Sequence, residues 1–162
     1  MAVDMFLKIE SLEGESQDKT HKGEIQILGF SWFVSQTGTS GAGSGAGTGK
    51  SEFQDLEVRK AVDRASPVLM KLCASGAHLT SADLTVRKAG GDALEYLIIR
   101  LEDLMITSYH VLGEPKDDVV QEVVRINYTR AAIHYTPQES SGIGGAKVSG
   151  GWNLKENAPF DG

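Results

Sequence analysis

The sequence predicts an all-β domain, a sandwich or a barrel, with one short helix docked on its outside. Apolar and polar residues alternate with period two in most of the apolar segments, which is the pattern of half-buried strands. The segments between them are rich in turn residues, as in AGGD (89–92) and GEPKDD (113–118). A single segment carries helix signals at both of its ends.

Eight strands follow from the alternation. In the first, Val3, Met5, Leu7 and Ile9 share one face. In the third, Leu56 and Val58 share one face, opposite Asp55, Glu57 and Arg59. The predicted strands are residues 2–9, 24–36, 53–61, 82–89, 94–101, 104–112, 121–130 and 131–137. Short strands at this spacing are typical of a sandwich or a barrel.

The predicted helix lies between Ser66 and Gly76. Ser66 is the expected N-cap, Pro67 occupies the first helical position and Gly76 stands where a C′ glycine belongs. Its apolar stripe consists of Val68, Leu69, Leu72 and Cys73. We expect this stripe to pack against the outside of the sheet, which assigns Cys73 to core packing.

Composition limits the classes of function. The chain has 162 residues, 40% of them hydrophobic, and a formal net charge of -6, which fits one ordinary globular domain over residues 1–162 and disfavours a nucleic-acid partner. A single cysteine excludes an internal disulfide framework and fits folding in a reducing compartment. The first residues lack a signal-peptide pattern, and no stretch is apolar enough to insert into a membrane.

Two segments are low in complexity. Residues 37–50 contain six glycines among fourteen residues, and residues 140–151 (SSGIGGAKVSGG) are similar. We interpret the first as a flexible loop and the second as a Gly-rich C-terminal segment. Loops this long in a small domain are usually functional or disordered.

Within the first loop, SGAGTGKS (44–51) resembles a nucleotide-binding P-loop. Gly49, Lys50 and Ser51 fit that motif, but Ser44 stands where its first glycine is required. A P-loop follows directly on a buried strand and opens a helix that faces the phosphates. Here about seven residues separate the predicted strand from Ser44, and the segment after Ser51 alternates as a strand. Nucleotide hydrolysis is therefore disfavoured.

Other catalytic patterns are also missing from the sequence. His21, His78, His110 and His134 show no metal-ligand spacing. Ser108, His110 and an aspartate could form a triad on paper, but no nucleophile-elbow motif accompanies them. We expect no enzyme, no catalytic residue, no metal and no cofactor.

Several motifs in order resemble one known family over residues 2–157. They are MAVDMFLKI, GESQDKTH, SWFVSQTG before a Gly-rich loop ending in Gly-Lys, DLEVRKAVDRASPVLM, TVRKAGG before EYLIIRL, and GWNLKEN. Together they resemble the haemolysin-coregulated (Hcp) proteins, the inner-tube subunits of the bacterial type VI secretion machine.

The resemblance implies a compact β-barrel with one flanking helix, which assembles into hexameric rings. The rings stack into a tube inside a contractile sheath, like the tail tube of a contractile phage. Implied partners are further copies of the chain, the sheath, the baseplate or spike, and small effector proteins carried in the lumen. The tube is assembled in the bacterial cytoplasm and secreted without a cleaved signal. A monomeric barrel that binds a ligand or peptide is the alternative.

Three groups of residues are candidates for assembly contacts. In residues 24–36, Phe30 and Trp32 share one face, so Gly29 and Ser31 on the other are the lumen candidates. The loop residues Thr37, Gly38, Gly49 and Lys50 are the candidates for contacts between subunits and rings. The candidate interface charges are Asp55, Glu57, Arg59, Arg87 and Lys88.

Overall fold

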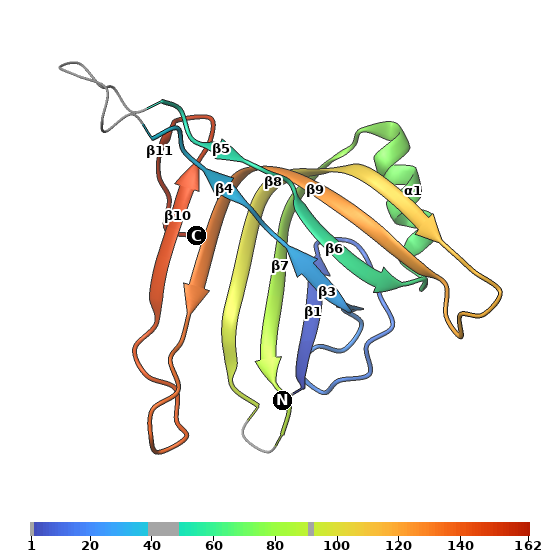
Figure 1. Ribbon diagram of the computed structural model, residues 1–162, viewed down its shortest axis with the longest axis horizontal. Helices are drawn as coiled ribbons and strands as arrows, with labels where there is room; N and C mark the ends of the chain where they lie inside the picture. The colour runs from blue at the N-terminus through green and yellow to red at the C-terminus, as the bar shows by residue number, and fades with distance from the viewer. Residues whose placement is uncertain (1, 39–48, 91–92) are drawn as a thin grey trace.

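The computed structural model describes residues 2–38, 49–90 and 93–162, and in these it holds eleven strands and one helix (Figure 1). The longest strands are β7 (His78–Lys88), β8 (Glu95–Leu112) and β9 (Gln121–Tyr135). The other elements are β1 (Val3–Ile9), β2 (Ile25–Gln26), β3 (Gly29–Ser31), β4 (Val34–Ser35), β5 (Glu52–Phe53), β6 (Leu56–Ala61), α1 (Ser66–Ser75), β10 (Val148–Asn153) and β11 (Ala158–Pro159).

Six antiparallel pairings close a barrel. Strands β1, β7, β8, β9 and β6 pair in that order, and β2 and β3 join its two ends, because β2 pairs with β1 and β3 pairs with β6. Between them, the amide of Ile27 donates to the Met5 carbonyl at 3.0 Å and the amide of Leu28 to the Arg59 carbonyl at 2.8 Å. The all-β prediction is confirmed, with a barrel as its form.

The barrel interior is filled by alternating apolar side chains from every strand around it. The largest of them are almost fully buried: Leu7, Ile9, Ile25, Leu56, Leu84, Ile99, Leu101, Leu104, Ile106 and Ile126. A small barrel of this kind has just enough space for its own side chains. The interior is therefore a core.

Strand boundaries differ from the sequence prediction where a strand changes partner. The single strand predicted at 24–36 is divided into β2, β3 and β4, because the chain leaves β1, crosses to β6 and then pairs with β5. Conversely, the two strands predicted at 94–112 are one, β8, in which Asp103 has a positive φ of 50°. The two predicted at 121–137 are likewise one strand, β9.

The Gly-rich segment 140–151 is only partly a loop, because β10 begins at Val148 and pairs with the second half of β9. Gly151 is required there: a Cβ at this position would lie 2.2 Å from the Phe160 carbonyl oxygen and 2.7 Å from that of Ala131. Gly151 therefore permits close strand packing, which the low-complexity interpretation missed.

Helix α1 packs on β8 and buries Leu69, and Cys73 packs partly buried against the core, as predicted. Gly76 ends the helix and adopts the expected left-handed conformation, with a φ of 63°. The predicted N-cap is wrong by one residue: Ala65 is the N-cap, and Ser66 is already helical and 3% exposed. No described helix has the length and apolarity needed to span a membrane.

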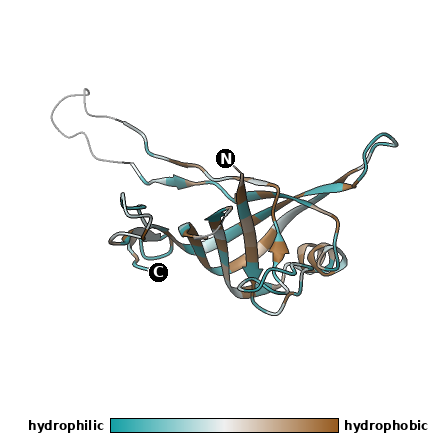
Figure 2. Ribbon diagram, turned by 90° about the horizontal axis from the view of Figure 1, so that it is seen from below, coloured by the Kyte–Doolittle hydropathy of each residue, from teal (hydrophilic) through white to brown (hydrophobic). Residues whose placement is uncertain are grey.

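Two extensions leave the barrel at opposite ends. Residues 33–38 and 49–53, which we call the arm, contain the β4–β5 pair and project on one side (Figure 2). Residues 111–120, which we call the hairpin tip, continue β8 and β9 beyond the barrel on the other side.

Candidate functional site

A polar face covers the outside of the barrel beside the arm. Ser31 on β3 lies opposite Glu57 on β6, and Glu57 lies opposite Arg125 on β9. Arg125 Nη2 is 3.1 Å from a Glu57 carboxylate oxygen. Ser31 is exposed and lines a polar hollow of about 400 Å³ together with Glu57 and Arg125. The expected outward orientation of Ser31 therefore agrees with the structure.

Gly29, the other lumen candidate, is not open to solvent. It is buried under Arg59, which is its partner on β6, and a Cβ at Gly29 would lie 2.5 Å from Arg59 Nη2. Arg59 is exposed. Of this pair, Arg59 is thus the residue that faces outward, and Gly29 provides the space for its side chain.

The acidic candidates on this face already have partners in their own chain. Asp55 accepts hydrogen bonds from the Thr107 hydroxyl at 2.5 Å and from the Asn127 amide at 2.9 Å. Together with the Glu57–Arg125 pair, these bonds fix the polar side chains in place. The face is accordingly a preorganised polar wall.

Arg87, a candidate interface charge, is only 9% exposed and is paired within its own chain, so little of it is accessible to another subunit. Its guanidinium donates to both carboxylate oxygens of Asp18, at 3.0 and 2.6 Å, and to Asp4 at 3.1 Å. It also lies 5.0 Å from the centre of the Phe6 ring. The hydrogen bond from Arg87 holds the pKa of the Asp18 carboxyl well below its usual range. We call these four residues the Arg87 cluster.

The Arg87 cluster fastens the loop of residues 14–24 to the barrel, with His21 as a second anchor. His21 stacks on Phe6 with ring centres 4.4 Å apart. Its two ring nitrogens lie 2.8 Å from Glu24 and 2.5 Å from Glu95. Lys88, the other basic candidate on β7, contacts the Gln138 side chain and the Tyr96 ring.

A second buried set of charges, which sequence analysis missed, lies under α1. Lys60 and Glu122 are both 0% exposed and form an ion pair. Asp63 lies 2.8 Å from Lys60 Nζ, and the Ser66 hydroxyl donates to Glu122 at 2.7 Å. Tyr109 donates to the other Glu122 oxygen, and burial together with that carboxylate raises the pKa of Tyr109 to about 12. We call these five residues the Lys60 cluster.

The signal for the Lys60 cluster was present in the sequence. Lys60 continues the inward-facing positions of Leu56 and Val58, and Glu122 continues those of Val124 and Ile126. When each of two strands carries one charged residue on its apolar face, the two residues are expected to pair in the core, because a buried charge requires a partner.

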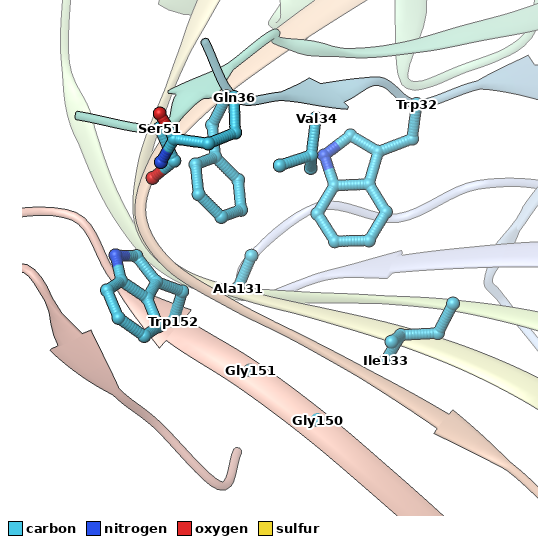
Figure 3. Close-up of a pocket in the computed structure, with 10 residues that line it drawn as sticks. Trp32, Val34, Gln36, Ser51, Ala131, Ile133, Gly150, Gly151 and Trp152 are labelled. Carbon is cyan, nitrogen blue, oxygen red and sulfur yellow. The ribbon is translucent and has the colours of Figure 1, made fainter. Parts of the chain in front are cut away.

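An apolar groove runs between the root of the arm and the β9–β10 pair (Figure 3). Its volume is about 420 Å³. One wall carries Trp32, Val34 and Phe53, and the other carries Ile133, Trp152 and the backbone of Gly150 and Gly151.

The root of the arm is fixed above this groove by an aromatic cluster. Trp32 Nε1 donates to the Tyr128 hydroxyl at 2.6 Å, and that hydroxyl donates to the Gln54 carbonyl at 2.7 Å. Phe53 packs edge-on against Tyr128, with ring centres 6.4 Å apart. Burial raises the pKa of Tyr128 to about 12, so its hydroxyl remains a donor at neutral pH. The arm therefore leaves the barrel in a set direction.

The far end of the molecule exposes apolar side chains as well. At the hairpin tip, Val111, Leu112, Val119 and Val120 are 42–51% exposed. On α1, Val68 and Met70 are 43% and 51% exposed. Large exposed apolar areas on a folded domain are typical of protein interfaces.

The four loop candidates Thr37, Gly38, Gly49 and Lys50 are all exposed at the two ends of the described arm. Ser51 is followed by β5, so the helix that a P-loop requires is replaced by a strand, as predicted. Residues 44–48 of the P-loop-like run lie outside the described residues. In the described part of the chain, no group of three or more His, Cys, Asp or Glu could hold a metal ion.

Comparison with known proteins assigns the chain to a family. The family described as type VI secretion system effector, Hcp, matches residues 6–135. Protein hcp1 of Pseudomonas aeruginosa is 44% identical over 159 residues, which are 97% of this chain and 98% of that protein. The structure of Hcp1 from Salmonella typhimurium is 35% identical with a TM-score of 0.84, covering 99% of this chain and all of that one.

A further structure, described as a type six secretion system protein, is 29% identical with a TM-score of 0.92 and covers 98% of this chain and all of that chain. The sequence and the fold of this chain thus match those of its relatives over nearly their whole length. This chain belongs to the Hcp family of type VI secretion system proteins.

Proposed function

We propose that this protein is the inner-tube subunit of a type VI secretion machine, which forms hexameric rings that stack around a channel and carry small effector proteins. Its family makes it a secreted, structural type VI secretion protein. The hexameric ring, the effector cargo and the contacts with the sheath and the spike are the parts of the proposal that go beyond this family assignment. Assembly in the cytoplasm and export as part of the ejected tube belong to the same proposal.

The observation that carries the proposal is the preorganised polar wall around Ser31. Its charged side chains are already paired with each other, so they need no partner to remain stable in water. A wall of this kind suits a channel in which cargo slides, because an apolar wall would retain it. We therefore assign Ser31, Glu57 and Arg125 to the lumen.

The alternative, a monomeric barrel that binds a ligand, has less support. Such a barrel would hold its ligand in an internal apolar pocket, but this interior is filled by core side chains. The apolar groove lies outside the barrel, between the arm and β10. A surface of that kind suits a protein partner better than a small molecule enclosed in a barrel.

The arm is the proposed contact between stacked rings. The residues at its described ends, Thr37, Gly38, Gly49 and Lys50, are exposed. Deleting residues 38–49 should weaken stacking more than ring closure. Tubes that form as before would contradict this role.

The test of the proposed function uses electron microscopy and sedimentation of the purified chain, which should reveal rings. Ser31→Trp should leave the rings intact and reduce the amount of effector that copurifies with them at least tenfold. Thr80→Trp, at an exposed position on β7, is the matched control and should retain effector. Effector retention by Ser31→Trp would remove Ser31 from the lumen.

A further inference from the structure

We propose that the apolar groove of one subunit receives the hairpin tip of the next subunit in the ring. This inference rests on the proposed function, since it assumes that subunits meet side by side. The two surfaces that meet are the groove walls, which include Trp32 and Ile133, and the hairpin tip, which includes Leu112 and Val120.

The two surfaces lie at opposite ends of the molecule. Figure 1 places β4, β5 and β10, which border the groove, at one side of the barrel, and the tip of β8 and β9 at the other. Contacts between two different patches on each subunit are heterologous, and they generate a ring when the rotation between neighbours closes. A groove at one end and a projection at the other are the arrangement that such a contact requires.

The hairpin tip fits a groove with two apolar walls because it is apolar on both of its faces. Val111 and Leu112 are consecutive in a strand, so their side chains point to opposite faces of the two-stranded ribbon. In Figure 3, Trp32 and Val34 lie across the groove from Ile133 and Trp152. A ribbon in this space would therefore cover apolar surface on both sides.

Helix α1 is a weaker candidate for the groove. One face of α1 is packed on β8, so its exposed apolar residues, Val68 and Met70, can cover only one wall.

Charge distribution favours the same pairing. The hairpin tip contains three exposed acidic residues, Glu114, Asp117 and Asp118, and one basic residue, Lys116. At the other end, exposed Lys50 precedes Ser51 in the groove wall, and exposed Lys147 precedes β10. Complementary charges at the rim of an interface increase the rate of association and fix its orientation.

The test uses two charged variants, one for each surface. Leu112→Asp on the tip and Ile133→Asp in the groove should each be monomeric where the parent chain forms rings. Mixed in equal amounts, they should form a 1:1 dimer of twice the monomer mass, because each variant retains one intact surface. Met70→Asp on α1 is the matched control and should form rings as the parent does.

Both tryptophans of the chain line the groove, so fluorescence reports its occupancy directly. Emission should shift to shorter wavelength as the parent chain assembles and should not shift in either variant alone. Rings formed by Leu112→Asp at parental yield would overturn the contact and leave the proposed function standing. A parent chain that stays monomeric would defeat the proposed function and this contact with it.

Disulfide trapping remains decisive if a charged variant does not fold. In a Cys73→Ala background, Val120→Cys combined with Ile133→Cys should give a ladder of linked subunits on mild oxidation. The pair Met70→Cys with Ile133→Cys should give no ladder. The opposite result would place α1 in the groove and overturn the proposal.

Discussion

The Lys60 cluster and the Arg87 cluster each fasten a peripheral segment to the same barrel, but water reaches them to different extents. Lys60 and Glu122 are both 0% exposed. In the Arg87 cluster, Arg87 is 11% exposed at its side chain, and Asp18 and Asp4 are 23% and 46% exposed. The ion pair at the centre of the first cluster is sealed from water, whereas the second cluster is open at its acidic side.

This difference determines how each cluster should respond to mutation. A buried ion whose partner is removed keeps its charge in a poor solvent, which is strongly destabilising. A carboxylate that reaches water can be solvated instead. The segments differ too, because the Lys60 cluster includes Ser66 of α1, whereas the Arg87 cluster holds the 14–24 loop.

The largest effect is expected for Lys60→Met. Glu122 would remain buried without its cation, and the free energy of unfolding should fall by about 3–5 kcal/mol. Chemical denaturation at fixed protein concentration measures this change. A loss below about 1 kcal/mol would mean that water enters the cluster.

The double variant Lys60→Met with Glu122→Leu is the control for that experiment. Removing both charges should recover most of the lost stability, because well-packed apolar residues can replace a buried ion pair without a penalty. A double variant as unstable as Lys60→Met would assign the loss to packing around Lys60.

Arg87→Ala should have a smaller and more local effect. The pair with Asp18 is bidentate, so its loss should lower the free energy of unfolding by about 2–3 kcal/mol. Hydrogen exchange should quicken at the amides of residues 14–24 and stay unchanged in α1. Arg87→Lys should recover little, since an ammonium cannot make the bidentate contact. Equal acceleration in α1 would remove the distinction between the clusters.

Tyr109→Phe tests the rim of the Lys60 cluster and should lower the free energy of unfolding by about 1 kcal/mol. Glu122 would lose one neutral donor but keep Lys60 and Ser66. Chemical denaturation again provides the measurement. A loss as large as that of Lys60→Met would show that the phenol, and not the ammonium, compensates the buried carboxylate.

The sequence predicted the fold class because nearly every strand has one face in the core, so period two is visible in the residues themselves. The strand boundaries were less predictable, since the break at residues 27–28 depends on a change of partner from β1 to β6. Strand β10 was hidden by Gly150 and Gly151, which carry no apolar signal, although Gly151 allows close packing.

The candidate site was predictable only in part. Ser31 followed from alternation within one strand, and it is exposed as expected. Arg87 was predicted as an interface charge, and its position in the sequence does not reveal that Asp18 folds back over it. The groove could not be predicted, because Trp32 and Trp152 are far apart in the sequence and reach its two walls only through the tertiary fold.

The smallest effect is expected in acid and concerns the Asp18 carboxylate of the Arg87 cluster. Arg87 holds the pKa of Asp18 below its usual range in the folded chain, whereas an unfolded aspartate has a pKa of about 3.9. The stability from this pair is therefore complete above about pH 4 and is lost as the pH falls further. Asp18→Asn should flatten the dependence of unfolding free energy on pH between about 4 and 2.5, because residue 18 then carries no titratable carboxyl. A slope unchanged by Asp18→Asn would mean that other carboxylates control acid unfolding, and that the open cluster adds nothing that protonation can remove.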